Sequence, residues 1–579
     1  MLFQPGYNPI TRVNQPTPAI VAQGAVRRLP RVALILFCLA YIVPGFIGRE
    51  PWKSADMATF GYMLEMARGA TGWFDPQLVG LRPEADGLLP YWLGAWFVHA
   101  GPAWLSPALA ARLPFAAMLA LALAATWYAV YYLARNPQAQ PVAFAFGGEA
   151  NPADYARAIA DGGLLALIAC LGLAQLSHEA TTNLAQLCFC ALTFFGAASI
   201  GYRVVAPTSG FAIGMAGLVL SGAPAMAVLF GAGSALLHLL AVDLQTGGRR
   251  NAQRAAGSVA LVTLLAAALA SGLDLWHWRI LLPLDAGSRD WRGLARLLLW
   301  FTWPAWPLVM WTLWRWRLQI FSRRVSLHMA LPLWFAGVAV VATLTTRPAE
   351  RALLLALPSL ATLAAFALPT LQRSVAALID WFTLLFFTGC GLIIWVIWVA
   401  MQTGFPRQPA ANVLRQAPGF EASFSLVAFL IALAATLVWA WLVKWRAGRH
   451  RAAIWKSLVL PAGGAALCWL LLMTLWMPLL DFVRSYKVVV HNVAAVVGRP
   501  SCLQVLDLNR EQLAAFRYHG AFVLKPVADP ARCPWLLVNP DSRTGLQNGA
   551  SASQWRLQAV IRRPSEKAED VLLFRRVAP

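Results

Sequence analysis

One stretch of the chain, residues 49–114, carries side chains capable of chemistry between two long apolar runs. Asp56 stands about nine positions after Ile47, where the first apolar run ends. A carboxylate here could act as a general base, orient a reactant or hold a metal ion. It could equally cap a helix, since Ser54 and Asp56 both suit an N-cap position. A carboxylate so close to a membrane segment indicates chemistry at the boundary between water and lipid.

A second candidate carboxylate, Glu179, follows His178 in a short loop between apolar runs. Ionisable residues within or beside membrane segments are candidates for function, because placing a charge there is costly. A helix-end cap is the competing interpretation of Glu179, and the sequence leaves both open.

A divalent metal ion is one option for a cofactor, and we expect no other cofactor. His277 could bind such an ion together with Glu84 or Asp86, because histidine and carboxylate ligands suit divalent ions. However, His277 stands between Trp276 and Trp278, and this setting also suits an interfacial anchor. No phosphate-binding glycine-rich loop and no zinc-finger spacing of Cys and His is apparent.

The composition is that of a membrane protein. The chain has 579 residues, of which 59% are hydrophobic and 12% are charged. Apolar runs of about 18 or more residues recur, and about 20 helical residues cross the hydrocarbon core. In a soluble protein the net charge of +22 would suggest nucleic acid as a partner. Here the basic residues stand between apolar runs, which favours contact with anionic lipid headgroups and no nucleic-acid partner.

The lengths of the apolar runs predict about thirteen transmembrane helices. The first run follows several arginines and lacks the features of a cleavable signal peptide, so we expect the N-terminus in the cytoplasm. Alternating spans then place most loop Arg and Lys residues on that side, in agreement with the positive-inside rule. The expected spans are 32–47, 108–133, 163–176, 183–201, 210–221, 223–242, 256–273, 293–318, 327–345, 351–369, 376–400, 422–445 and 457–480.

The last hundred residues differ in character, since their apolar runs are short and polar residues are frequent. We expect residues 1–480 to form the transmembrane domain, with a first extracytoplasmic loop at 48–107. Residues 481–579 should form a small soluble α/β domain outside the cytoplasm, with short strands and one helix. Cys502 and Cys533 lie in it and are candidates for a disulfide in an oxidising compartment, although sequence does not fix their separation.

Two amphipathic helices are predicted within the first loop, both lying in the membrane interface. Gly72 and Trp73 separate them, and the second covers residues 88–98. The first follows Asp56, because apolar residues recur there at helical spacing: Met57, Phe60, Met63, Leu64 and Ala67.

Short motifs follow this first helix: G-x-W-x-x-P-x-x-x-G from Gly72 to Gly80, Y-W-L from Tyr91 and R-L-P from Arg112. In this order they resemble the first loop of integral-membrane glycosyltransferases with the GT-C fold. The nearest branch resembles the aminoarabinose transferases that modify lipid A and the related protein mannosyltransferases. Weaker similarities follow at Gly217–Pro224, Pro304 and Arg347–Pro358.

The resemblance implies a mostly α, polytopic fold and the transfer of a sugar from a polyprenyl phosphate to a lipid or protein acceptor. Asp56 occupies the position of the family's catalytic acidic residue, and Glu179 matches a second recurring acidic position. Asp56 would be the general base for a hydroxyl acceptor, whereas for a phosphate acceptor it would orient the acceptor or hold a metal.

The phosphate leaving group of such a donor needs cationic partners, ideally arginines that grip its oxygens with two hydrogen bonds. For arginines at a span entry, a snorkelling contact with lipid headgroups is the competing interpretation. The candidate substrate-binding residues are Lys53, Arg82, Tyr91, Arg347 and Arg351.

The sequence departs from the family pattern at three places. Met57 stands where the family often has Glu, and Asp86 stands where a Lys is expected. The turn at residues 221–224 lacks the Lys of the family's T-K-G-P-like turn. Either the donor is held differently, through Arg82 or Lys53, or this branch uses another substrate or has lost transferase activity.

We therefore predict a glycosyltransferase in the bacterial inner membrane, with a cytoplasmic N-terminus and a periplasmic C-terminal domain. Its expected partners are a polyprenyl-phosphate-linked sugar donor, lipid A or another envelope glycolipid as acceptor, and membrane lipids. The alternatives are a non-catalytic lipid or sugar carrier and a protein O-mannosyltransferase-like enzyme. No internal symmetry of the kind found in transporters is apparent, which favours an enzyme.

Overall fold

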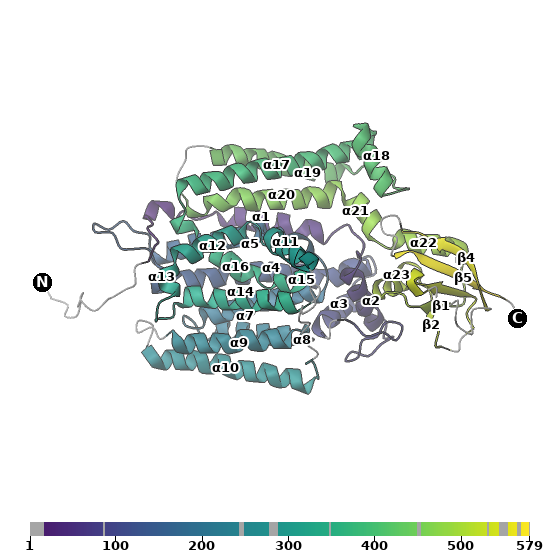
Figure 1. The fold of residues 1–579 in the computed structure, drawn as a ribbon, viewed down its shortest axis with the longest axis horizontal. Coiled ribbons are helices and arrows are strands. Elements are labelled where there is room, and N and C mark those ends of the chain that lie inside the picture. Colours follow the sequence, from purple (N-terminus) through teal and green to yellow (C-terminus); the bar gives the residue numbers. More distant parts are fainter. Residues whose placement is uncertain are drawn as a thin grey trace.

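The structure, a computed structural model, describes residues 17–577 except 85–86, 242–247, 277–287, 347–348, 448–452, 530–531, 543–553 and 564–568. Long helices run side by side along the molecule, and a small mixed α/β domain follows at one end (Figure 1). The predicted fold class, a mostly α polytopic protein with a C-terminal α/β domain, is confirmed.

Within the described residues, seven helical segments are long and apolar enough to cross a membrane. Shorter apolar helices join them in the bundle: α1 (Arg31–Ile42), α8 (Val205–Leu220), α9 (Pro224–Leu240) and α16 (Leu357–Ala365). The expectation of about thirteen spans stays a prediction. The seven are α4 (Pro107–Ala134), α7 (Thr182–Ser199), α10 (Gly248–Gly272), α14 (Leu327–Thr345), α17 (Arg373–Thr403), α19 (Leu426–Ala447) and α20 (Val459–Leu475) with the η5 turn (Ile454–Leu458) before it.

Several predicted spans differ in their bounds from the helices of the structure, and a proline marks the difference at two of them. The helix expected at 163–176 is α5 (Pro152–Ala169), which begins at a proline, a residue suited to the first helical turn. The span expected at 293–318 is two helices, α11 (Ser288–Phe301) and α12 (Ala305–Arg315), separated at Pro304. Proline lacks an N–H group and its ring clashes with the preceding turn, so the helix breaks there.

The chain's N-terminal segment and the C-terminal domain lie at opposite ends of the bundle (Figure 1). Two hydrogen bonds attach the N-terminal segment to the bundle. Gln23 N donates to Gly148 O (3.0 Å), and Trp455 Nε1 donates to Arg27 O (2.7 Å). Basic residues follow helices that end there, as Arg135 follows α4. The bundle therefore has one end rich in arginine and one end that carries a folded domain.

The C-terminal domain is a five-stranded mixed sheet with strand order β2-β1-β3-β5-β4. β1 is parallel to β2 and β3, whereas β5 is antiparallel to β3 and β4. Helices α22 (Lys487–Val497) and α23 (Arg510–His519) accompany the sheet (Figure 1). The strands are β1 (Leu503–Leu506), β2 (Leu524–Pro526), β3 (Trp535–Val538), β4 (Trp555–Ile561) and β5 (Val571–Arg576).

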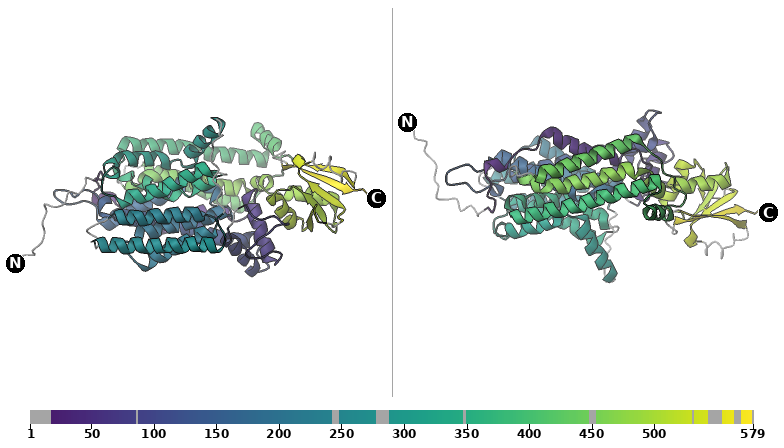
Figure 2. Two further views of the ribbon diagram at one scale, coloured as in Figure 1. Left: turned by 60° about the horizontal axis from the view of Figure 1, so that its bottom comes forward. Right: turned by 90° about the horizontal axis from the view of Figure 1, so that it is seen from above.

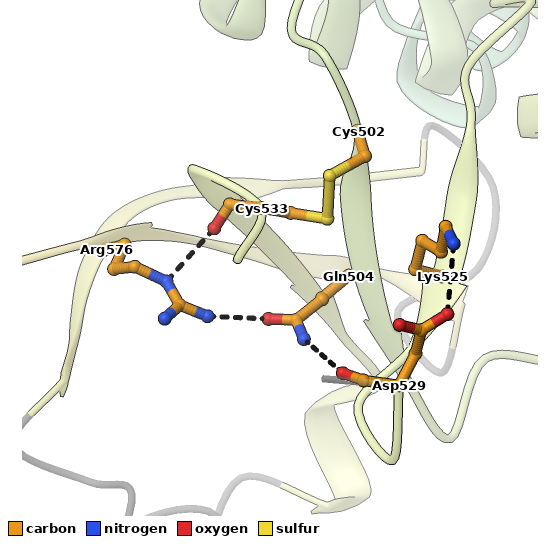
Figure 3. Close-up of a disulfide and its surroundings, with 6 residues drawn as sticks. All are labelled: Cys502, Gln504, Lys525, Asp529, Cys533 and Arg576. Carbon is orange, nitrogen blue, oxygen red and sulfur yellow. Dashed lines mark hydrogen bonds and ion pairs between the residues drawn. A yellow bond between two sulfur atoms is a disulfide. The ribbon is translucent and has the colours of Figure 1, made fainter. Parts of the chain in front are cut away.

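A disulfide between Cys502 and Cys533 ties the start of β1 to the segment before β3, with a Cα–Cα distance of 5.2 Å. Figure 3 shows a polar chain beside it, in which Arg576 donates to Cys533 O (3.1 Å) and to Gln504 Oε1 (3.0 Å). The two cysteines that sequence marked as a candidate pair are joined in the structure.

The first loop forms α2 (Ala55–Ala67) and α3 (Leu89–Ala100), which lie between the bundle and the C-terminal domain (Figures 1 and 2). The prediction that both helices lie in the membrane interface stays a prediction, but α2 lacks the exposed face expected of an amphipathic helix, because it is buried on nearly all sides. Small residues allow this: a Cβ on Gly61 would come within 2.4 Å of Ala514 in α23. A Cβ on Gly94 of α3 would come within 2.2 Å of the Met63 side chain.

We expect loss of the disulfide to loosen the C-terminal domain while the bundle stays folded. The bridge spans 31 residues, for which chain entropy gives about 3–4 kcal/mol of stabilisation. The double variant Cys502→Ser/Cys533→Ser should be cut faster by trypsin within residues 481–579. A matched control is Cys38→Ser/Cys468→Ser, which changes two free, half-buried cysteines of the bundle. Equal cleavage of all three proteins would contradict the prediction.

Candidate active site

Asp56 lies in the first turn of α2 and is 1% exposed, although it carries a carboxylate. Its Oδ2 accepts hydrogen bonds from Arg49 Nη1 (2.6 Å) and from the backbone N–H of Trp52 (3.1 Å). Its Oδ1 accepts from the N–H of Ala180 (2.9 Å), which belongs to the loop before α7. The carboxylate therefore joins the segment after α1 to a loop more than a hundred residues away.

Arg49 is the centre of this arrangement and is itself buried. Its Nε donates to Gly45 O (2.9 Å) and its Nη2 to His178 O (2.7 Å), and its guanidinium stacks on Trp52 at 4.6 Å. All three donating nitrogens of Arg49 thus have partners, since Nη1 binds Asp56. A planar guanidinium can satisfy such a set of oxygens at fixed angles, which a lysine cannot.

Gly45 and His178 pack closely beside Arg49. A Cβ on Gly45 would come within 2.2 Å of the His178 ring. His178 is buried, and its ring lies 4.6 Å from that of Trp469. Burial lowers the pKa of His178 to about 4, so the imidazole is neutral at ordinary pH.

A second guanidinium reaches the site from the start of α4. Arg112 Nη1 donates to Arg49 O (2.6 Å), and Arg112 Nη2 lies 3.8 Å from Asp56 Oδ2. Arg112 is 2% exposed, and within the described part of the chain its Nη2 has no hydrogen-bond partner. The site therefore holds a buried guanidinium with a donor still available.

The two carboxylates at the site have opposite tendencies to ionise. Burial opposes ionisation of Asp56, but the Arg49 and Arg112 charges outweigh it and hold the pKa of Asp56 below its usual range. For Glu179, burial and the nearby Asp56 charge raise the pKa to about 7. Glu179 is 6% exposed, and Gln175 Nε2 donates to its Oε1 (3.1 Å). One carboxylate is thus fixed as an anion, whereas the other titrates near neutral pH.

The C-terminal part of the chain closes this site through α21 (Met477–Arg484). Asp481 Oδ1 accepts from the N–H of Glu50 (2.8 Å) and from Trp52 Nε1 (3.1 Å). The N–H of Lys53 donates to Arg484 O (3.0 Å). The loop that anchors Asp56 is therefore held from both sides, by the bundle and by α21.

A polar cavity of about 530 Å³ lies where the far end of α2 meets the C-terminal domain. Arg517 of α23 binds Glu65 of α2 with two hydrogen bonds, of 3.2 and 2.6 Å. Asp75 and Gln77 also line the cavity, whereas Asp56 and Glu179 do not. The cavity thus lies at the contact between α2 and the C-terminal domain, two to three helical turns from Asp56 along α2.

Two solved structures resemble the chain, whereas no family model and no curated protein matches it. One is ArnT from Cupriavidus metallidurans bound to undecaprenyl phosphate, with a TM-score of 0.55 and 16% identity over 95% of this chain and 99% of that chain. The other is the same ArnT in the apo state, with a TM-score of 0.53 and 15% identity over 94% and 98%. The chain has the fold of ArnT. The expected GT-C-like architecture is therefore confirmed over nearly the whole length.

The ArnT-like fold brings some predicted site residues together and leaves others apart. Asp56 and Glu179 meet at one place, as described. Lys53 lies next to it, with its Nζ 3.8 Å from Glu569 of the C-terminal domain. Tyr91 is buried against Tyr62, at a ring distance of 5.6 Å.

The remaining candidates lie further out or outside the described residues. Arg82 is 74% exposed and pairs with Asp75 (3.0 Å). Arg351 is half-buried in the short helix α15 (Ala349–Leu354). Arg347 is among the residues that the structure does not describe.

The predicted metal set is only partly visible. Asp86 and His277 lie outside the described residues, and Glu84 pairs with Arg510 of the C-terminal domain (3.2 Å). Within the described ranges, no group of three or more His, Cys, Asp or Glu side chains could hold a metal ion. A divalent metal therefore stays a prediction without support from these residues.

The turn that lacks the family's lysine lies against the loop before α3. Leu88 N donates to Leu220 O (2.7 Å), and a Cβ on Gly87 would come within 2.7 Å of the Ser221 carbonyl carbon. The described residues Gly87 and Leu88 thus lie against this turn, whereas Asp86 lies outside the described residues.

Sequence reasoning did not identify Arg49, Arg112 or Asp481 as site residues. Arg112 was noted only within a motif, although an arginine in an apolar run is itself a signal. The signal for Arg49 is weaker, because an arginine that ends a span usually anchors it to headgroups.

We expect Arg49→Ala to destabilise the protein strongly. The substitution leaves Asp56 as a buried carboxylate with reduced compensation, for which a loss of about 3–5 kcal/mol is typical. Thermal unfolding in detergent, followed by Trp fluorescence, should show a large fall in Tm. Arg68→Ala is the control, since Arg68 is 47% exposed and pairs with Glu65 at the surface. Similar losses for the two variants would contradict a central role for Arg49.

The raised pKa of Glu179 predicts how stability depends on pH. The unfolded chain releases this proton near pH 4.5, whereas the folded protein holds it until about pH 7. This contribution to stability therefore falls as pH rises through that window and is constant above it. The variant Glu179→Gln removes the contribution, so its Tm minus that of wild type should increase between pH 5 and 7.5. A difference that stays constant over this range would show that Glu179 titrates normally.

Proposed function

We propose that the protein is a membrane glycosyltransferase that moves a sugar from a polyprenyl-phosphate-linked donor to lipid A or another envelope glycolipid. The fold supports this proposal, because the similar ArnT structure was solved with undecaprenyl phosphate bound. The observation that carries it is the pair of buried carboxylates, Asp56 and Glu179, which meet beside Arg49 and Arg112 and whose pKa values are shifted in opposite directions. Pairs of this kind supply the acid and base functions of many enzymes.

The proposal includes an orientation in the bacterial inner membrane. The arginine-rich end of the bundle would face the cytoplasm, in keeping with the positive-inside rule. The C-terminal domain and the Asp56 site would then face the periplasm. A disulfide such as Cys502–Cys533 suits an oxidising compartment, which supports this assignment. A lipid-linked donor reaches that face through the bilayer.

In the proposed reaction the bond between the anomeric carbon and the phosphate oxygen breaks, and its electron pair leaves with the polyprenyl phosphate. A new bond forms between the anomeric carbon and an oxygen of the acceptor. Arg112 is the buried cation best placed to bind the leaving phosphate, because its Nη2 has no hydrogen-bond partner within the described residues. A guanidinium in a buried site binds phosphate oxygens strongly.

For a hydroxyl acceptor, we propose that Glu179 and not Asp56 takes the proton. Both oxygens of Asp56 already accept hydrogen bonds, and its lowered pKa makes it a weak base. A base works best when its pKa lies near the working pH, and the pKa of Glu179 is raised to about 7. Asp56 would then hold Arg49 and Arg112 in place and balance their charge. For a phosphate acceptor no base is needed.

We expect two different activity defects. Lipid A from cells that lack the gene and carry a plasmid copy can be analysed by mass spectrometry for an added sugar. Asp56→Asn should abolish the addition, because it removes the charge that organises both arginines. Glu179→Gln should reduce the rate of transfer to a hydroxyl by at least about 100-fold and remove the rise of the rate near pH 7. Asp75→Asn, at a half-exposed carboxylate of the same loop, is the control.

The outcomes separate the proposed function from its alternatives. Full activity of Asp56→Asn would contradict the site. A sugar added to envelope proteins and not to lipids would point to a protein O-mannosyltransferase-like enzyme. Transport without any glycosylated product would point to a carrier.

A further inference from the structure

A second cavity, of about 850 Å³, lies between α17, α21 and the short helix α18 (Arg407–Gln416). Figure 1 shows α18 across the end of α17, at the end of the bundle that carries the C-terminal domain. α17 and α19 present long apolar surfaces to their surroundings, as membrane-spanning helices do. The cavity therefore lies where these helices leave the hydrocarbon core. We refer to it as the α17–α21 groove.

The α17–α21 groove is apolar along its walls and polar at one rim. The walls are formed by aliphatic side chains of α17 and α21, and the rim is formed by Asn412, Arg415 and Gln416 of α18. The wall residues are Leu392, Ile393, Val396, Ile397, Leu479, Leu480 and Val483.

The charge at the rim is positive. No Asp or Glu lines the groove, and Arg415 donates to a neutral partner, Asn412 Oδ1 (3.1 Å). Among the residues that the structure describes, Arg415 has no carboxylate within ion-pair distance. A second arginine, Arg407, begins the same helix and is exposed. An apolar trough with a cationic rim matches an amphiphile that has hydrocarbon chains and an anionic headgroup.

The two faces of α21 show why this amphiphile is not the reacting substrate. Leu479, Leu480 and Val483 face the groove. Asp481 faces the Asp56 site instead, where it accepts from Glu50 N and Trp52 Nε1. A lipid in the groove is thus separated from Asp56 by α21 itself. Its headgroup would bind at Arg415 without reaching the buried carboxylates.

We propose that the α17–α21 groove is a binding site for an anionic phospholipid of the membrane, which supports α21 from the side opposite the Asp56 site. The acyl chains pack on the aliphatic walls, and the phosphate pairs with Arg415. An apolar cavity of this size facing a bilayer gains free energy when hydrocarbon fills it, because its walls otherwise lack contacts. The proposal is independent of the glycosyltransferase activity, since it concerns binding alone.

The test uses the full-length protein purified in detergent and stripped of lipid. Phosphatidylglycerol and zwitterionic phosphatidylcholine with the same acyl chains are added, and bound lipid is measured by native mass spectrometry. Wild type should bind phosphatidylglycerol more tightly. Arg415→Gln should weaken phosphatidylglycerol binding by about fivefold and phosphatidylcholine binding by less, because the choline cation offsets the phosphate charge in phosphatidylcholine. Val396→Trp fills the groove and should greatly reduce binding of both lipids.

Two matched controls keep the test specific. Arg407→Gln removes a charge from the same helix outside the groove. Leu385→Trp adds an indole to α17 at a position that is 66% exposed and does not line the groove. Both controls should bind as wild type does. Equal losses for Arg407→Gln and Arg415→Gln, or unchanged binding by Val396→Trp, would overturn the proposal. So would the result that an added polyprenyl phosphate, and not phosphatidylglycerol, is the lipid whose binding Val396→Trp abolishes.

Discussion

The buried ion pair between Arg49 and Asp56 is the interaction on which the surrounding structure depends. Removing two charges from water is costly, and their attraction repays it only with good geometry and further hydrogen bonds. Here those bonds come from distant parts of the chain: Arg49 donates to Gly45 O and His178 O, and Asp56 accepts from Ala180 N. The pair is therefore stable only when the end of α1, the start of α2 and the loop before α7 meet.

The C-terminal part of the chain also contacts the segment that carries Arg49 and Asp56. α21 leads from the bundle into the domain and binds the loop of residues 50–53 through Asp481 and Arg484. The domain then returns to the same loop helix, since α23 packs on α2 and Arg517 binds Glu65. A helix held on all sides in this way fixes the direction of Asp56 more firmly than an interfacial helix would.

Particular residues show how far sequence reasoning reaches. Asp56 and Glu179 could be proposed because carboxylates are rare beside apolar runs and stand out there. The burial of α2 could not be predicted, because the spacing of its apolar residues fits an interfacial helix and a helix packed on two sides equally well. Only the close approach at Gly61 and Gly94 distinguishes them, and it depends on partners in α23 and α3. Likewise, proline at 304 marks a break, but run length alone suggested one continuous span.

The sequence by itself determined the membrane class, the order of apolar segments, the separate C-terminal domain and the two acidic candidates. These properties follow from local composition and from the spacing of apolar residues, because each segment partitions between hydrocarbon and water according to its own side chains. The tertiary structure decided which carboxylate stays ionised, since that depends on Arg49 and Arg112 reaching Asp56 from different segments. It also decided that Glu179 titrates near neutral pH, because burial and the charge of Asp56 act only once the chain has folded.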